Sequence, residues 1–596
     1  MGAPAAHSSP PATAATSNHR EKSASSTPLL FATVALISVL PYLPALKFGF
    51  VYDDDVQVVQ NRLLQSWRSL GAIFEQPSWS FLYSGLHGGY YRPVFLAWLS
   101  FLHHLFGLRP EGWHFSSLLL HGFVSGLLFL LLRRHAFAPW IAIVAALLFG
   151  LHPVHVESVA WVSGSTDLLA AASLLASLLL WWKSTEDTPR ARWMLPFSLF
   201  FYMVALLAKE TAIIFPGIVF VYVYSHRGVS LAANNSKSQE LPALRKALPF
   251  LAVAVIYLGL RHVVLNGSVT TFTMAGLRMT IATAPALLLF YLRHLIWPIG
   301  LSLFYSFVPN AFVTSSSFLL PFLVLVLLAG TAGWLVPRFR SFRAVTGFSW
   351  LLFPLLPVLW VPFFPAGDQA HDRYLYLPSV GLAILGAELL RFAAQQVPRS
   401  SILKSSVGVV LLLLTASTVI ESRPWRNDVS LYRHACRVSR DHPIACNNLA
   451  VALIGQGEYG EARDILRPLL QTHRDSSRIN GNFGIANYRL ADFATAESAL
   501  RRATELDPAY ADAFLYLALT CYRTNRLQEA ELLLRQAVSL DPAAEGYHLA
   551  LGSVLMAQNK YQEACEQLRE ELRQRPGLGA ALGLLRDCEG RLAQRN

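Results

Sequence analysis

The chain has 596 residues, of which 54% are hydrophobic and only 14% are charged, and its formal net charge is +12. Soluble proteins carry about 25% charged residues, so this composition excludes a chain that is soluble throughout. The basic excess does not indicate a nucleic-acid partner, because much of it lies in short loops between apolar runs, where Lys and Arg report membrane orientation.

The chain is long enough for two or more structural units. Residues 1–28 are rich in Ala, Ser, Thr and Pro, which predicts a disordered cytoplasmic tail rather than a cleaved signal. Residues 29–421 are a series of apolar runs with short polar loops, whereas 422–596 have an ordinary charged composition. We therefore expect an all-α chain, with a polytopic membrane domain at 29–421 and an extracytoplasmic domain at 422–596.

A lone helix needs about 20 apolar residues to cross a bilayer, and a helix buried among others needs somewhat fewer. Eleven runs qualify: 29–46, 112–132, 138–151, 167–182, 193–208, 210–225, 247–265, 317–336, 345–363, 379–393 and 404–420. Two weaker runs, 93–107 and 281–297, are interrupted by basic or histidine residues. Counting either as a span would place Arg-rich loops outside, so both are predicted to lie at the outer interface.

With the N-terminus inside, this topology collects the remaining polar clusters on the outer face. The clusters are 53–92, 152–167, 209–210, 266–280 and 368–373. The domain at 422–596 follows an odd number of spans, so it is predicted to be extracytoplasmic too.

The outer loop 47–111 opens with three consecutive carboxylates, Asp53, Asp54 and Asp55, directly after the first apolar run. One explanation is a solvated cap on a membrane helix, because charges cost little in the headgroup region. The other is a general base, held where a membrane-bound substrate meets an aqueous one. The residues alone do not rank Asp53 against Asp54.

The loop after the third run contains His152, His155, Glu157 and Asp167. Two histidines three residues apart with a carboxylate are compatible with a metal, but a third clear ligand is missing. A hydrogen-bonded loop is the simpler interpretation, and no metal is expected.

Two further clusters contain cations. Lys209 and Glu210 interrupt two apolar runs, and ionisable residues at that depth are expensive enough to indicate either function or mutual pairing. Arg373 has a planar fork suited to phosphate oxygens, although an interfacial Arg beside aromatic residues is also a common membrane anchor. Its neighbours are His371, Asp372 and Tyr374.

The extracytoplasmic domain repeats every 34 residues: Ala462, Ala496, Ala530 and Ala564 recur at that interval, as do Pro508, Pro542 and Pro576. This period is typical of tetratricopeptide repeats, whose small residues let paired helices approach closely. Four repeats are predicted between 443 and 576, with a half-repeat at 428–440 and a capping helix at 578–594. Such arrays bind peptides or partner proteins on a concave face.

All five cysteines lie in this domain, at positions 436, 446, 521, 565 and 588. Their odd number and irregular spacing predict neither a disulfide framework nor a zinc site. We expect small buried residues, with a bridge between Cys436 and Cys446 as the alternative.

Several motifs occur together in one family. They are Phe50-Val51-Tyr52-Asp53-Asp54, Tyr91-Arg92-Pro93, His152-Pro153-Val154-His155-Val156-Glu157, Ala208-Lys209-Glu210 and Asp372-Arg373-Tyr374-Leu375-Tyr376. In this order they resemble the transmembrane and tetratricopeptide-repeat-containing O-mannosyltransferases, which are C-type glycosyltransferases using polyprenyl-phosphate sugars. The resemblance covers nearly the whole chain from residue 29. One departure is Ser165, where the family usually has a basic residue, and this leaves one donor-phosphate contact unassigned.

The resemblance implies inverting transfer of a sugar, expected to be mannose, from a polyprenyl or dolichyl phosphate to Ser or Thr hydroxyls of secreted or envelope proteins. By this resemblance, Asp53 is the first candidate for the general base, and Asp54 assists it. The donor phosphate and lipid are expected to bind to Arg92, Lys209, Arg373 and Tyr374. Supporting roles fall to His152, His155, Glu157, Asp167, Glu210, His371 and Asp372. The scheme requires no metal or cofactor, since a lipid phosphate is already a good leaving group.

Two alternatives remain: transfer to an envelope lipid or glycan, and a non-catalytic scaffold that displays the repeats. The partners expected are the lipid-linked sugar, membrane lipid, and an acceptor or partner protein on the repeats, with no nucleic acid. The Ala/Pro-rich tail and compact length favour a bacterial inner membrane, with the endoplasmic reticulum membrane as the eukaryotic counterpart.

Overall fold

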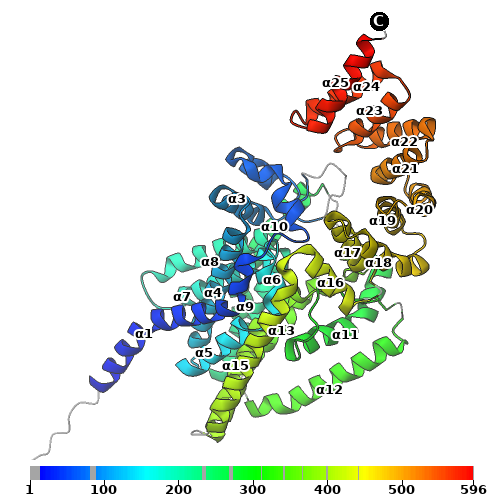
Figure 1. Ribbon diagram of the computed structural model, residues 1–596. Helices are drawn as coiled ribbons and strands as arrows, with labels where there is room; N and C mark the ends of the chain where they lie inside the picture. The colour runs from blue at the N-terminus through cyan, green and yellow to red at the C-terminus, as the bar shows by residue number, and fades with distance from the viewer. Residues whose placement is uncertain are drawn as a thin grey trace, which may run out of the picture. The chain divides into compact units, whose positions relative to one another are not determined.

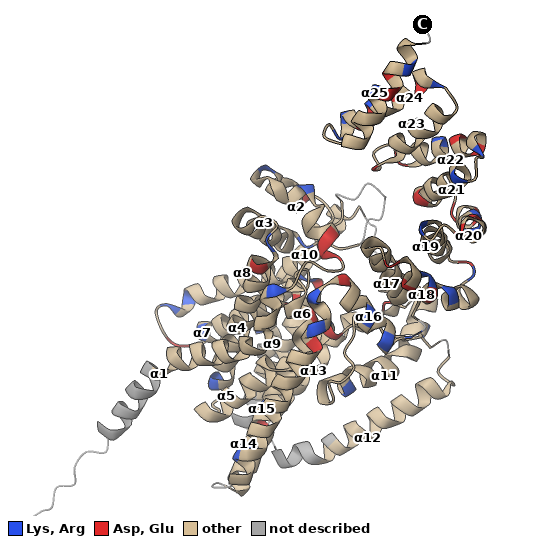
Figure 2. Ribbon diagram, in the orientation of Figure 1, with Lys and Arg blue, Asp and Glu red and all other residues tan. Residues whose placement is uncertain are grey.

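The computed structural model describes residues 14–80, 89–230, 237–266, 273–310, 312–339, 342–364, 367–397, 401–440 and 442–594. These residues form helices and no strand, and the chain divides into two compact units, Met1–Leu431 and Tyr432–Asn596 (Figure 1). We call them the membrane unit and the repeat unit. Charged residues are dense along the repeat helices and nearly absent from the described part of α12 (Figure 2).

The membrane unit is a bundle of apolar helices. Its helices are α1 (Ala14–Val39), α2 (Leu70–Glu75), α3 (Pro93–Phe106), α4 (Pro110–Arg134), α5 (Pro139–Gly150), α6 (Val156–Ala160), α7 (Ser165–Ser184), α8 (Ala191–Ala208), α9 (Phe215–Ser230), α10 (Lys237–Val264), α11 (Met274–Ile296), α12 (Ser316–Phe339), α13 (Phe342–Leu352), α14 (Pro378–Gln396) and α15 (Ser401–Ser422). Proline occupies the first position of α3, α4, α5 and α14, where its missing N–H leaves no bond unmade. The predicted tail is helical from Ala14 onward, and residues 1–13 lie outside the described residues.

Eight helices of the described residues are long and apolar enough to cross a membrane, or nine if the bent pair Pro139–Gly150 and Pro153–Ala160 is one span. The chain is thus a multi-pass membrane protein, but the set differs from the eleven predicted spans. Predicted spans 210–225, 317–336 and 379–393 are absent, and 138–151 is present only through the bent pair. One helix is added, Met274–Ile296. That helix begins seven residues before the predicted run at 281–297, and this extra length is what qualifies it.

Close helix contacts hold the bundle together. Helix α4 packs against α1 and α7, and α7 packs against α8. Helices α13 and α14 approach so closely that a Cβ at Gly381 would collide with the backbone of Leu351 and Gly347. Small residues permit such contacts in membranes, where association depends on packing rather than on a hydrophobic driving force.

The repeat unit follows the predicted period. Its helices are α17 (Pro443–Gln456), α18 (Tyr459–Thr472), α19 (Ser477–Arg489), α20 (Phe493–Leu506), α21 (Ala511–Arg523), α22 (Leu527–Leu540), α23 (Tyr547–Ala557), α24 (Tyr561–Gln574) and α25 (Gly579–Ala593). The four recurring alanines are fully buried, as the repeat pattern predicts. Helix α16 (Asp428–Val438) matches the predicted half-repeat, and α25 matches the predicted cap.

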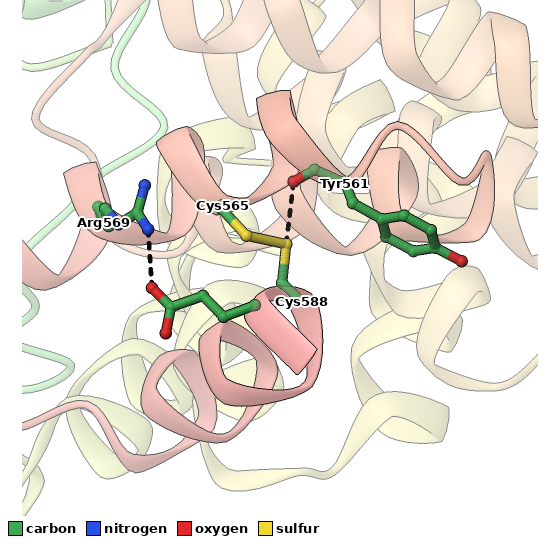
Figure 3. The surroundings of a disulfide bond; sticks show 5 residues. Tyr561, Cys565, Arg569 and Cys588 are labelled. Carbon is green, nitrogen blue, oxygen red and sulfur yellow. Dashed lines mark hydrogen bonds and ion pairs between the residues drawn. A yellow bond between two sulfur atoms is a disulfide. The ribbon is translucent and has the colours of Figure 1, made fainter. Parts of the chain in front are cut away.

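Disulfides join the outermost helix pairs of the array. Cys436–Cys446 links α16 to α17, as the alternative interpretation allowed, and Cys565–Cys588 links α24 to α25 (Figure 3). The expectation that Cys565 and Cys588 are unbridged is therefore wrong. A separation of 23 residues does not by itself predict a disulfide. The two cysteines come together because α25 packs against α24 in the repeat array. Cys521 is free and buried.

Candidate active site

A cavity of about 260 Å³ lies in the membrane unit, and four of the five predicted outer-face clusters contribute to its wall. One part of the wall is charged: Asp53, Arg92, Lys209, Glu210, Arg261 and Arg373. Another part is apolar and aromatic: Trp79, Phe95, Ile213, Leu258, Val358, Trp360, Phe363 and Phe364. No described residue of the cluster 266–280 lines it, and 267–272 lie outside the described residues.

A tight turn places the acidic motif. The amide of Asp54 donates to the carbonyl of Val51 (3.0 Å), and Tyr52 between them has a φ of 56°. A non-glycine residue adopts this left-handed conformation only when its surroundings hold it there. The Tyr52 amide donates to the carboxylate of Asp428 (2.9 Å), and its ring packs on Trp161 and Phe304.

The turn separates the two candidate bases. Asp54 is fully buried, and its Oδ1 accepts from the Ser163 amide (2.8 Å) and hydroxyl (2.6 Å). Burial raises the pKa of Asp54 to about 7, against the lowering effect of the Ser163 hydrogen bonds. A Cβ at the neighbouring Gly164 would lie 2.7 Å from the Glu157 carbonyl, so only glycine lets this loop approach closely. Asp54 therefore ties the acidic loop to the 161–164 loop.

Asp53 instead lines the cavity. Burial raises the pKa of Asp53 to about 6, an effect that Arg373 opposes and Asp368 reinforces. The carboxylate accepts a hydrogen bond from the Gln57 side chain, another cavity residue. A carboxylate in this position is a stronger base than a solvated aspartate.

Three cavity cations are held by carboxylates. Arg92 makes a two-pronged bond to Glu210 through Nε (2.9 Å) and Nη2 (2.5 Å). Lys209 donates to Asp167 (2.5 Å), and both side chains are buried. Lys209 and Glu210 therefore do not form the mutual pair that is the alternative to a functional role, and each pairs with a residue more distant in the sequence.

The third pair joins two motifs far apart in the sequence. The backbone amide and the Nη1 of Arg373 both donate to Glu157, and the guanidinium lies over the rings of Trp161 and Tyr374. Glu157 is buried behind the cavity and fixes where Arg373 points. Burial would otherwise lower the pKa of Arg373, but Tyr374 and Glu157 raise it, so the cation is permanent.

Other predicted residues support the wall from behind. His371 approaches Asp368 (3.0 Å) and the Leu303 carbonyl (3.2 Å). Asp372 accepts from Tyr305 (2.5 Å) and the Ser302 amide (3.2 Å), and burial raises its pKa well above the usual range.

The two histidines of the 151–167 loop hold separate partners. His152 Nε2 contacts the Leu295 carbonyl (3.0 Å), and His155 Nε2 contacts the Ser379 hydroxyl (2.8 Å). Both are buried, and neither lines the cavity. Each of these two rings thus makes a hydrogen-bonding contact with a different segment of the membrane unit.

Sequence reasoning missed Arg261 and Ser163. Arg261 lies near the end of α10, inside the candidate span Ala243–Val264, and a cation within a span is a signal that could have identified it. Nothing in the sequence marks Ser163, because its role depends on the contact between the 161–164 loop and Asp54, which only the folded chain forms. Ser165, which departs from the family pattern, is buried and does not line the cavity.

Comparisons with known proteins find tetratricopeptide repeats in the repeat unit and protein O-mannosyl-transferases similar to the chain. Tetratricopeptide repeat models match residues 444–476, 482–545 and 533–579. Protein O-mannosyl-transferase Tmtc3 of Drosophila melanogaster is 27% identical, with 80% of this chain and 59% of that protein covered. Protein O-mannosyl-transferase TMTC4 of Mus musculus is 28% identical, with 72% and 64% covered. The chain thus spans about three fifths of the length of these curated relatives.

Among solved structures, TTC0263, a thermophilic TPR protein of Thermus thermophilus, is 20% identical. It covers 31% of this chain and 95% of its own length, with a TM-score of 0.25.

Proposed function

We propose that this chain, a homologue of the transmembrane, tetratricopeptide-repeat-containing protein O-mannosyl-transferases, transfers mannose from a polyprenyl or dolichyl phosphate to Ser or Thr hydroxyls of proteins. The observation that carries this proposal is a single cavity wall with a carboxylate, fixed cations and an apolar part. A lipid-phosphate sugar has the matching chemistry: a polar sugar, an anionic phosphate and an apolar chain.

In the proposed reaction the acceptor hydroxyl attacks the anomeric carbon as the bond from that carbon to the phosphate oxygen breaks. The electron pair of the broken bond leaves with the polyprenyl phosphate, and the hydroxyl proton passes to Asp53. The transition state resembles an oxocarbenium ion, and one carboxylate opposite the leaving group gives inversion.

The leaving group needs positive charge rather than an acid, because a phosphate is stable as an anion. Arg92, Lys209 and Arg373 are held in place by their carboxylate partners, so they need not reorganise when charge develops on the phosphate. No metal or cofactor takes part in this scheme. Asp54 acts through the loop by holding the turn that aims Asp53.

We place the repeat unit on the extracytoplasmic side, in a bacterial inner membrane or an endoplasmic reticulum membrane, where it presents an acceptor polypeptide or binds a partner protein. Its two disulfides support this placement, since disulfides persist in oxidising compartments and are rare in the cytosol.

The proposal is tested with membranes that contain the full chain and radiolabelled polyprenyl-phosphate-mannose. Label should enter protein, be released by β-elimination as sugar on Ser or Thr, and be removed by α-mannosidase if a β-linked donor is inverted. Label found only in lipid or glycan would show that the acceptor is a lipid or glycan rather than a protein. Absence of transfer from every lipid-linked sugar tried would favour the scaffold alternative.

A further inference from the structure

The cations that line the cavity differ in whether a carboxylate forms an ion pair with them. Each of three cations has its own carboxylate: Arg92 with Glu210, Lys209 with Asp167, and Arg373 with Glu157. These pairs are already compensated before any ligand binds.

Arg261 is the exception among these cavity cations, because no carboxylate of the described residues lies within ion-pair distance of it. Its Nη2 donates to the carbonyl oxygen of Gly89 (2.9 Å), which is a neutral acceptor. The neighbouring segments that the structure does not describe, 81–88 and 267–272, contain no Asp or Glu in their sequence. Neither the described residues nor these two segments therefore supply a carboxylate partner for Arg261.

The position of Arg261 makes this imbalance significant. It lies three residues before the end of the candidate span Ala243–Val264, and a cation inside a span normally faces a protein interior, a water-filled cavity or an anion. Tyr257, Leu258 and Arg261 all line the cavity from α10, as their helical spacing of three and four residues permits. A guanidinium has five N–H donors, and one bond to Gly89 leaves others for a ligand.

We propose that Arg261 binds the phosphate of the lipid-linked donor and is its principal counter-ion. This inference rests on the proposed function, because it assumes that a lipid phosphate enters the cavity. The guanidinium fork suits phosphate oxygens, and a site with an uncompensated cation gains more from binding an anion than a site whose cations are already paired. The three paired cations then position the phosphate, while Arg261 offers it a cation that no carboxylate of the described residues holds in an ion pair.

A structural role is the competing explanation, in which Arg261 only holds the backbone at Gly89. Arg261→Gln separates the two, because its amide keeps a donor for a carbonyl but has no charge. Arg245→Gln is the matched control, since Arg245 is an exposed residue of the same helix and does not line the cavity.

The test measures binding of undecaprenyl phosphate and of undecaprenol to the purified full chain in lipid nanodiscs. Wild type and Arg245→Gln should prefer the phosphate. Arg261→Gln should weaken phosphate binding about 10- to 100-fold, the range for one charge-assisted bond, and leave undecaprenol binding unchanged. Arg261→Lys should retain part of the preference.

Unchanged phosphate binding in Arg261→Gln would overturn the proposal, and equal losses for both lipids would assign Arg261 a structural role instead. The binding test needs no sugar transfer. Loss of phosphate preference in Arg261→Gln, together with no transfer by wild type, would therefore leave Arg261 as a lipid-phosphate ligand and reject the mannosyltransferase.

Discussion

At the scale of single residues, the turn at Tyr52 gives two adjacent aspartates different surroundings. Asp53 lines the cavity, whereas Asp54 is fully buried on Ser163. The sequence identifies the acidic motif but not this division. The directions of the Asp53 and Asp54 side chains depend on the backbone turn at Tyr52, which the sequence does not reveal. The left-handed φ of Tyr52 is held by contacts with Asp428, Trp161 and Phe304, which are distant in the sequence.

The pH dependence of transfer should follow Asp53. A general base acts only when deprotonated, and burial raises the pKa of Asp53 to about 6. The rate with saturating donor should therefore fall about tenfold per pH unit below 6 and be flat between 7 and 8. A profile that stays flat down to pH 4.5 in the initial-rate assay would exclude Asp53 as the base.

At the scale of elements, buried ion pairs connect loops that follow different helices. The sequence indicates that Lys209, Glu210 and Arg373 are unusual, because charge at that depth is expensive. It does not indicate their partners, since Asp167 and Glu157 lie 42 and 216 residues away from Lys209 and Arg373. Pairings over such separations require the packed bundle.

Breaking one buried pair should destabilise the membrane unit. Asp167→Asn leaves the buried Lys209 without its carboxylate, which should lower the free energy of unfolding by about 3–5 kcal/mol. Glu186→Gln is the control, because it breaks the more exposed pair with Arg134, worth no more than about 1 kcal/mol. Thermal unfolding in detergent compares them, and equal stability of the two variants would show that the Lys209 pair is not a buried structural contact.

The left-handed turn at Tyr52 should be needed to position Asp53. Tyr52→Val places a β-branched residue at a φ of 56°, which should cost about 1–3 kcal/mol and misplace Asp53. Tyr52→Gly accepts this φ and should keep more transfer activity, although it loses the aromatic contacts. If the valine variant is the more active one in membranes, the left-handed turn is not needed to position the base.

At the scale of the whole molecule, the two units differ in how well the sequence predicts them. The 34-residue period predicts the repeat helices because each repeat contacts its neighbours in a fixed register. The membrane spans are less well defined. The charges of the loops predict that 281–297 lies at the interface, yet the longer helix Met274–Ile296 is long and apolar enough to span a membrane. Hydropathy locates apolar helices but not where each helix begins.

The disulfides give a prediction for the repeat unit. A thiol-reactive maleimide should label one cysteine, Cys521, in the unfolded but unreduced chain, and all five after reduction. Cys588→Ser should release α25 from α24 and lower the stability of this unit by about 3 kcal/mol on the chain-entropy estimate. Labelling of all five thiols without reductant would place the repeats in a reducing compartment and contradict the proposed side of the membrane.

In the proposed reaction Asp53, rather than Asp54, is the base of a lipid-dependent sugar transfer. The most direct measurement is the rate of mannose transfer from radiolabelled polyprenyl-phosphate-mannose to protein, for wild type, Asp53→Asn and Asp54→Asn at matched protein levels. We predict that Asp53→Asn lowers the rate by about 10²- to 10⁴-fold with donor binding retained, whereas Asp54→Asn acts mainly by lowering the amount of folded protein. Near-normal transfer by Asp53→Asn would contradict the assignment.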